Sequence, residues 1–271
     1  MDIDALKAKA KEIRYRIADM CVRFGGHCAS SFSNVEILVT LYHGGVLRNS
    51  PETMDDDNRD RFILSKGHGE TGYYAVLADV GYFPQSWIET SYRQGDCKLA
   101  GHPEIEVPGV EITSGALGHG LNIGCGISLA AQMNGQDHLQ FVLMGDAECT
   151  EGSVWEAASF AASQKLHRLV GIIDRNHIGS IDYTNKYTSL EPLAEKWEKF
   201  GWEAISVDGH DFEKLFEVFE YARTRKSDKP LMIVAETVKG KGVSFMENDP
   251  IWHVKGLTDP VEIELARKEL S

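Results

Sequence analysis

The fold is decided by residues 139–176, which read LQFVLMGDAECTEGSVWEAASFAASQKLHRLVGIIDRN. This stretch begins with a short apolar run at 139–144 and ends with another at 169–174, and the residues between them contain a candidate helix at 153–166. Two short apolar strands joined by a helix of a dozen residues indicate a parallel βαβ unit. Both runs are apolar on consecutive residues, which is typical of a sheet that helices cover on both faces.

The same pattern continues after this stretch. Apolar runs at 202–207 and 231–237 flank a candidate helix at 211–226, so two more strands are expected. The sequence therefore predicts an α/β fold with a doubly wound, mostly parallel sheet flanked by helices.

Helices are also expected before the sheet. Residues 4–24 carry apolar side chains at helical spacing, and 72–80 form a second candidate helix. Ser33 is expected to cap a further helix, with Glu36 three residues later completing a capping box.

No linker rich in Pro, Gly or Ser and no internal repeat divides the chain. We therefore expect a single domain over residues 1–256. Residues 257–271 are expected to form a short charged C-terminal tail with a helix at 259–270.

Composition excludes several classes of protein. With 28 Lys+Arg against 41 Asp+Glu the net charge is −13, whereas a phosphate backbone requires a basic surface, so no nucleic-acid partner is expected. The five cysteines form no Cys-x-x-Cys pair, which favours a reducing compartment. No apolar run is long enough to span a membrane and no signal peptide is visible at the N-terminus, so we expect a cytoplasmic protein with no membrane contact.

Two strand ends carry polar residues suited to a metal ion. Asp146 follows Gly145 after the first run, and Asn176 lies 30 residues later, after the second run. Ligands of parallel α/β sheets bind at the carboxyl ends of strands, and carboxylate, amide and carbonyl oxygens are ligands of Mg²⁺ or Ca²⁺. The alternative is a plain strand-end turn with an N-cap, and these residues alone leave both interpretations open.

Histidines follow glycines more often than chance predicts. Glycine makes up 26 of 271 residues, so about one of the ten histidines should follow a glycine, yet five do: His27, His68, His102, His119 and His210. Imidazoles on glycine turns are candidates for proton transfer and phosphate contact. For any one of them the alternative is an exposed turn residue.

Two glycine-rich segments remain ambiguous from the residues alone. The 113–120 loop, TSGALGHG, imitates a dinucleotide fingerprint weakly, and a close approach of backbone to a flat ligand explains it equally well. Lys239 opens a Lys-Gly-Lys-Gly segment that is either a phosphate contact or a solvated turn.

Taken in order, the motifs of this chain resemble those of the N-terminal, thiamine-diphosphate-binding half of transketolases. The resemblance covers residues 5–256. It rests on Gly26-His27, Ser65-Lys66-Gly67-His68-Gly69, Gly101-His102-Pro103-Glu104, the 113–120 loop, Gly145-Asp146 with Asn176, and Trp252-His253. In the family's cofactor motif the second residue after Gly145 is a glycine, and here it is Ala147.

The resemblance implies a role for each matching residue. Asp146, Asn176 and the carbonyl of Ile178 would hold Mg²⁺ or Ca²⁺ against the diphosphate. The cofactor would also be approached by the remaining binding residues: His68, His253, Gly145 and the backbone of Ala147 near the diphosphate, and the main chain of Gly115 and Leu117 at the aminopyrimidine. Catalytic positions would be His27 and His102 in the substrate channel, His68 and His253 beside the cofactor, and Glu151 in a carboxylate network that couples paired sites.

The resemblance also implies the reaction and a partner. With thiamine diphosphate bound, a two-carbon ketol unit would pass from a ketose, either a sugar phosphate or a modified sugar, to an aldehyde. The family's pyrimidine-binding domain is not found in this chain, so a C-terminal-half subunit is expected to complete each site in an α₂β₂ assembly. This chain alone is expected to be inactive.

Three alternatives stay open from the sequence. One is another thiamine-diphosphate carboligase of the deoxyxylulose-phosphate-synthase kind, and a second is a 2-oxo-acid dehydrogenase of the alpha-subunit type. The third is a non-catalytic protein that retains the cofactor fold. A comparison of pyruvate with a ketose as donor separates the first two from a transketolase, and calorimetry with the cofactor tests the third.

Overall fold

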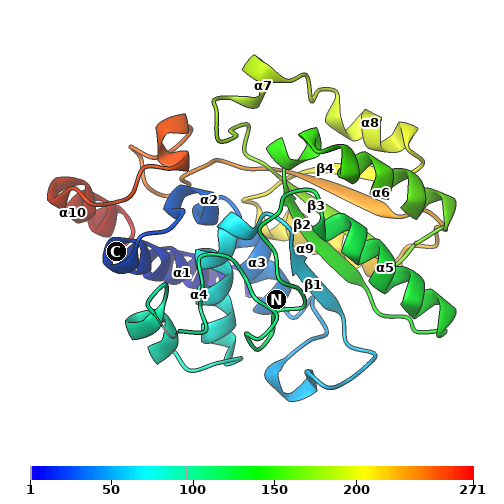
Figure 1. Ribbon diagram of the computed structural model, residues 1–271, viewed down its shortest axis with the longest axis horizontal. Helices are drawn as coiled ribbons and strands as arrows, with labels where there is room; N and C mark the ends of the chain where they lie inside the picture. The colour runs from blue at the N-terminus through cyan, green and yellow to red at the C-terminus, as the bar shows by residue number, and fades with distance from the viewer. Residues whose placement is uncertain (1, 96) are drawn as a thin grey trace.

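The architecture is a parallel sheet between two layers of helices (Figure 1). The structure is a computed structural model that describes residues 2–95 and 97–271. The strands are β1 (Arg61–Leu64), β2 (Gln140–Gly145), β3 (Leu169–Arg175), β4 (Glu203–Asp208) and β5 (Leu231–Glu236). The helices are α1 (Ile3–Phe24), α2 (Cys28–Phe32), α3 (Val35–Tyr42), α4 (Glu70–Val80), α5 (Gly120–Met133), α6 (Gly152–Ser163), α7 (Thr184–Tyr187), α8 (Leu193–Lys199), α9 (Phe212–Thr224) and α10 (Pro260–Glu269).

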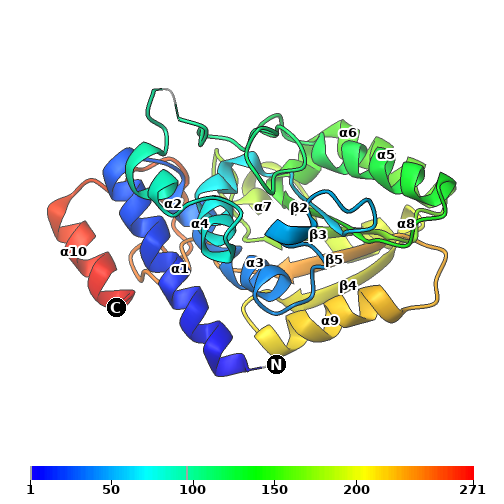
Figure 2. The ribbon, with the colours of Figure 1, turned by 90° about the horizontal axis from the view of Figure 1, so that it is seen from below.

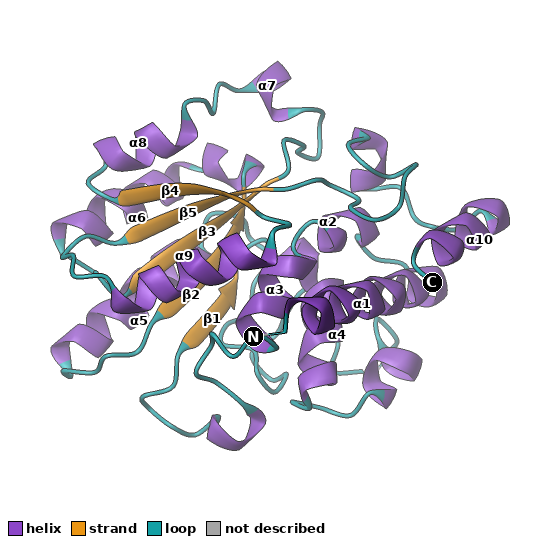
Figure 3. Ribbon diagram, turned by 180° about the vertical axis from the view of Figure 1, so that it is seen from behind, coloured by secondary structure: helices purple, strands orange, loops and turns teal. Residues whose placement is uncertain are grey.

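The predicted α/β fold is confirmed, since all strands pair in parallel in the order β1-β2-β3-β5-β4. Figure 3 shows the strands fanning in one direction across the molecule. The four strands and the helices predicted from apolar patterning are all present, with ends that differ by a few residues. The domain boundary expected at residue 256 stays a prediction.

Consecutive residues of each strand enter two separate cores, because side chains alternate between the faces of a sheet. In β2, Phe141 and Leu143 pack in one core, while Val142 and Met144 pack in the other. Figure 2 shows α5 and α6 on one side of the sheet and α3 and α9 on the other. The sheet is therefore buried on both faces, as the apolar runs predicted.

Two expectations at the N-terminal side were wrong or incomplete. Ser33 does not cap α3, because its hydroxyl donates a 2.6 Å hydrogen bond to Asp174 of β3, and Asn34 takes the N-cap position without a side-chain bond. Strand β1 was not expected, since only four residues, Arg61–Leu64, form it. It pairs with β2 and ends directly before Ser65 and Lys66, so it brings that motif to the edge of the sheet.

Strand β4 lies at the edge of the sheet and is partly or fully exposed at every residue except Val207. Its partner β5 is buried at every residue but the last. Among the described residues, no helix is long and apolar enough to cross a membrane.

Candidate functional site

A cavity of about 490 Å³ lies at the carboxyl ends of β1, β2, β3 and β5. Parallel sheets bind ligands at this edge, where the helix connections change direction. Eleven of the twelve predicted site residues line it: His27, His68, Gly115, Leu117, Gly145, Asp146, Ala147, Glu151, Asn176, Ile178 and His253. Segments far apart in the sequence thus meet at one place, and the role of each residue stays a prediction.

His102 is the one predicted residue outside this lining, yet it lies next to it. Its Cδ2 is 3.2 Å from the point that a Cβ on Gly115 would occupy, and 3.0 Å from the corresponding point on Gly67. Gly115 has a φ of +148°, so both its backbone conformation and the lack of space require glycine. The backbone at Gly115 can therefore come close to a bound ligand.

The acidic side of the cavity is built by the ends of β2 and β3. The Asp146 carboxylate accepts hydrogen bonds of 2.8 Å from Arg175 and 2.7 Å from the His177 backbone, and its other oxygen accepts one from the Ala147 backbone. Burial raises the pKa of Asp146, although the Arg175 charge opposes that rise. Asn176 lies beside it, with its side-chain oxygen accepting a bond from the Ile178 N–H at 3.2 Å.

The cationic side is built around two lysines that are each 1% exposed, Lys66 and Lys239. Lys66 forms an ion pair with Asp174 and donates to the Ser30 carbonyl at 3.0 Å. Lys239 donates to the Ser30 hydroxyl at 3.0 Å, and within the described part of the chain it has no ion pair. Burial and then the nearby Lys66 charge lower the pKa of Lys239 to about 7. Lys66 therefore has a paired carboxylate, whereas Lys239 has none among the described residues.

Three histidine rings converge on the same side. The ring centroids of His27, His68 and His253 are 5.5 to 6.1 Å apart. Burial and the Lys239 charge lower the pKa of His253 to about 3, while burial and the Lys66 charge hold the pKa of His68 well below its usual value. Both rings are thus neutral at pH 7. His253 Nδ1 is buried, and it has no hydrogen-bond partner among the residues described.

A buried glutamate that sequence analysis missed, Glu148, fixes the glycine-rich loop against the sheet. Its carboxylate accepts from the backbone of Gly118 at 2.8 Å and of Gly145 at 3.1 Å, and from the Ser65 hydroxyl. Gly118 has a φ of +81°, and a Cβ there would be 2.6 Å from the Glu151 side chain. Glu151 itself is exposed and occupies the N-cap position of α6.

The arrangement is suited to an anionic ligand. The cavity is lined by two buried lysines and by imidazoles, together with the carboxylates of Asp146, Glu148 and Glu151. Lys66 is paired with Asp174, and Asp146 is paired with Arg175. No three His, Cys, Asp or Glu side chains in residues 2–95 and 97–271 gather as a metal site. Any divalent ion here would have to rely on amide and carbonyl oxygens as well.

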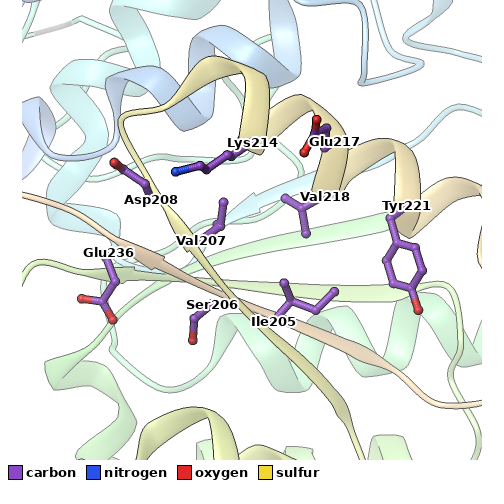
Figure 4. A pocket seen from close by; sticks show the side chains of 9 residues that line it. All are labelled: Ile205, Ser206, Val207, Asp208, Lys214, Glu217, Val218, Tyr221 and Glu236. Carbon is purple, nitrogen blue, oxygen red and sulfur yellow. The ribbon is translucent and has the colours of Figure 1, made fainter.

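A second hollow of about 680 Å³ lies elsewhere, between β4 and α9 (Figure 4). It is open to solvent, and its lining includes Asp208, Lys214, Glu217 and Glu236 but none of the predicted site residues. Figure 4 shows Lys214 directed toward Asp208, while Glu217 and Glu236 lie apart from them on α9 and at the end of β5. The smaller cavity is the better candidate, because its polar groups are buried and converge.

Four further residues of the site received no role from the sequence: Lys66, Glu148, Asp174 and Arg175. Lys66 and Arg175 stand inside motifs that were quoted, so their position next to Gly67 and Asn176 was the available signal. Lys239 was left undecided, and its burial favours a ligand contact over a solvated turn.

Comparisons with known proteins agree with this geometry. Residues 6–271 match the family "Transketolase, thiamine diphosphate binding domain". The chain is 42% identical to one of the subunits of apulose-4-phosphate transketolase from Actinobacillus succinogenes, over 100% of this chain and 97% of that protein. It is 37% identical to one of the subunits of 6-deoxy-6-sulfo-D-fructose transketolase from Clostridium sp., over 94% of this chain and 92% of that protein.

The solved structure of transketolase from Campylobacter jejuni superposes with a TM-score of 0.91 at 30% identity. The superposition covers 100% of this chain and 43% of that one, so the chain spans less than half the length of this single-chain relative.

Proposed function

Because this chain belongs to the transketolase family, as its thiamine diphosphate binding domain, we propose that it is the diphosphate-binding subunit of a two-subunit transketolase. Together with a second subunit it transfers a two-carbon ketol unit from a ketose to an aldehyde. The observation that carries this proposal is the nearly end-to-end match to relatives whose names describe one subunit of a transketolase, combined with a cavity that contains two buried lysines and three histidine rings.

The cavity suits the diphosphate of thiamine diphosphate. Lys66, Lys239 and the His68 ring supply hydrogen-bond donors, and His253 Nδ1 is a buried atom that still needs a partner. We assign the diphosphate contact to these groups and to Gly145 and the Ala147 backbone. Gly115 and Leu117 leave main-chain atoms for the aminopyrimidine, since Gly115 carries no side chain.

A divalent ion, Mg²⁺ or Ca²⁺, would be held by Asp146, Asn176 and the Ile178 carbonyl. The donor set fits a hard cation, because all three groups are oxygens and all three residues line the cavity. Asp146 is now bonded to Arg175, and Arg175 also bonds Glu191, so the arginine keeps a partner when the carboxylate binds an ion.

When bound, thiamine diphosphate would supply the nucleophile for the ketose carbonyl and the electron sink for cleavage of the carbon–carbon bond. This chain's own residues position the sugar and move protons. His27 Nδ1 lies 3.0 Å from the His253 carbonyl, so it carries the proton, and in the neutral ring Nε2 is free to accept one. Burial and the nearby His27 and Arg93 lower the pKa of His102, which keeps it neutral as a hydrogen-bond partner for sugar hydroxyls.

The partner is proposed to be a C-terminal-half subunit that carries the pyrimidine-binding domain, in an α₂β₂ assembly. Glu151, exposed at the start of α6, is proposed to join a carboxylate network across that interface. The relatives' names refer to a sugar phosphate and to a sulfonated sugar, and we propose a ketose of that kind as donor.

Reconstitution tests the proposal. The chain is mixed with the C-terminal-half subunit, thiamine diphosphate and Mg²⁺, and ketol transfer from several ketoses to glycolaldehyde is measured, with cofactor binding followed by calorimetry. Transfer is expected in the mixture and not with either polypeptide by itself, and chelation of the metal should abolish it. An assembled, cofactor-loaded complex that uses pyruvate and no ketose would contradict the proposal.

A further inference from the structure

A buried carboxyl group, that of Glu70, lies behind the proposed site and has no role so far. Glu70 is the first residue of α4 and is 0% exposed. One of its oxygens, Oε1, accepts hydrogen bonds of 2.6 Å from the Tyr92 hydroxyl and 3.4 Å from the Thr71 hydroxyl. The other oxygen, Oε2, is buried and has no hydrogen-bond partner among the residues described. Burial of a carboxyl group is costly, so its presence here needs a reason beyond packing.

The two hydroxyls bonded to Glu70 lie directly against the backbone of Gly26. The Thr71 and Tyr92 oxygens are 3.1 Å apart. A Cβ on Gly26 would be 3.0 Å from the Tyr92 oxygen and 3.1 Å from Thr71 Oγ1, and Gly26 has a φ of +128°. Both the backbone conformation and the close approach therefore require glycine. The next residue is His27, to which a proton transfer is assigned above.

The first turn of α4 also contacts the second histidine proposed for the substrate channel. Tyr74 donates a 3.0 Å hydrogen bond from its hydroxyl to the His102 carbonyl. The Tyr92 ring packs edge-on against the Tyr74 ring, with 6.1 Å between their centroids. The buried residues from Glu70 to Tyr74 thus contact the chain next to both His27 and His102.

The titratable and charged groups around this carboxyl come from several segments: Tyr92 and Arg93, Tyr74 of α4, Cys21 of α1 next to Tyr92, and Lys66 before α4. From α2 and the start of α3, the neutral Ser31 and Asn34 face this end of α4. Burial raises the pKa of Glu70 to about 7, although the Tyr92 hydroxyl and the Arg93 charge oppose that rise. The carboxyl therefore changes its charge near neutral pH. A proton on Oε2 still leaves Oε1 as the acceptor for Tyr92.

We propose that Glu70 is a positioning residue for ketol transfer, which fixes the Gly26–His27 backbone through the Tyr92 and Thr71 hydroxyls and does so more firmly when it is ionised. A hydrogen bond to a charged acceptor is about twice as strong as a neutral one. A small displacement of a group that transfers protons lowers the rate strongly, so kcat should respond to this bond while cofactor affinity does not. This inference rests on the proposed function, because it requires proton transfer at His27.

The test measures kcat of the reconstituted complex from about pH 6 to about pH 8.5. Glu70→Gln keeps the size and an acceptor oxygen but cannot ionise. Its kcat should equal that of the wild type at the acidic end and be about threefold to tenfold lower at the alkaline end, with KM and cofactor affinity nearly unchanged. Tyr92→Phe removes the donor and should lose the same pH-dependent component. The double variant should lose no more than Glu70→Gln alone, because both changes break one contact.

Tyr73→Phe is the matched control. Tyr73 lies on the same helix, is buried like Tyr92, and donates a 2.8 Å hydrogen bond from its hydroxyl to the Gly109 carbonyl. Its variant loses a buried hydroxyl that does not contact Glu70, so its kcat profile should stay parallel to that of the wild type.

Thermal denaturation of the cofactor-free complex follows the same carboxyl without any catalysis. A carboxyl group whose pKa rises from 4.5 to about 7 on folding binds more protons in the folded state, so it makes stability fall as the pH rises between these values. Glu70→Gln should lack this component of the fall, and Tyr73→Phe should keep it.

Three results would overturn the inference. They are a loss of kcat in Glu70→Gln that is equal at every pH, a kcat profile that is unchanged in both Glu70→Gln and Tyr92→Phe, or a pH dependence of stability that Glu70→Gln does not alter. If Glu70→Gln fails to assemble, Tyr92→Phe decides, and a profile parallel to the wild type contradicts the inference. Each result leaves the proposed function standing, provided the wild-type complex transfers the ketol unit. Absence of all transfer in the wild type would instead refute the proposed function.

Discussion

Two buried charge clusters in this molecule differ in how completely they are balanced. On one face of the sheet, Arg14 binds Glu36 through two hydrogen bonds of 2.6 and 2.7 Å, and His210 adds a third at 2.8 Å. At the carboxyl edge, Lys66 is paired with Asp174, whereas Lys239 has no ion pair among the described residues and donates to the Ser30 hydroxyl. The first cluster is complete without a ligand. The second leaves Lys239 without a paired carboxylate among the described residues, which favours it as part of the proposed anion site.

The balanced cluster should matter for folding and not for the ligand. Burial alone would raise the pKa of Glu36, but Arg14 and His210 lower it to about 2. Glu36→Gln leaves the buried Arg14 without a counter-charge, so the free energy of unfolding at pH 7 should fall by about 3 kcal/mol. Urea denaturation measures this loss.

The pH dependence of stability gives a second check on Glu36. A carboxyl group with a lowered folded-state pKa contributes stability above its unfolded value of 4.5, and this contribution disappears as the pH falls toward 2. The glutamine variant should show a smaller loss over that range. Calorimetry should find cofactor affinity unchanged, and a large decrease would mean that the two clusters are coupled.

The acidic side of the site should show the largest effect on cofactor binding. Asp146→Ala removes the charged oxygen ligand proposed for the metal, so affinity for thiamine diphosphate in the presence of Mg²⁺ should fall on the order of a hundredfold. Titration of the assembled complex measures it. Asp208→Ala, at the exposed end of β4, is the matched control. Equal affinities in both variants would remove Asp146 from the metal site.

Lys239→Met tests the lysine that has no ion pair among the described residues. It keeps a long side chain and removes a donor to the diphosphate, so cofactor affinity should fall about tenfold. A lysine whose pKa drops from 10.5 to about 7 on folding binds fewer protons when folded, so stability of the wild type should rise with pH between these values. The variant should lose that rise in thermal denaturation. A variant that keeps both the slope and the affinity would place the lysine outside the site.

The smallest effect is expected in the open groove of Figure 4. Lys214→Met removes an exposed lysine whose ion-pair partner, Asp211, is 3.4 Å away. The free energy of unfolding should change by less than about 0.5 kcal/mol, and cofactor affinity should not change. A loss comparable to that of Lys239→Met would show that the groove, rather than the edge cavity, takes part in binding.

The sequence predicted those parts of the fold and of the site that depend on patterns between residues close together in the chain. The apolar runs of β2 and β3 and the 30-residue spacing from Asp146 to Asn176 depend only on chain periodicity, and the structure places both residues in one cavity. Strand β1 was missed because four residues give too short a pattern. Ser33 was misassigned because its hydroxyl bonds Asp174, a partner 141 residues away.

The contacts of Glu148 and Lys66 could not be predicted either, because their partners are also distant in the sequence. Glu148 connects three segments through Ser65, Gly118 and Gly145, and Lys66 meets Asp174 only after β1 and β3 are placed in one sheet. Such contacts depend on strand order, and no local pattern contains that information.

Arg175 binds two carboxylates at once, and this affects what metal binding at Asp146 would require. Glu191 accepts hydrogen bonds of 2.7 and 3.1 Å from the same guanidinium that binds Asp146. The buried Asp146 carboxylate therefore has a positively charged partner before any cofactor binds. Since Glu191 holds the same guanidinium, Arg175 stays paired even if Asp146 turns toward a metal ion.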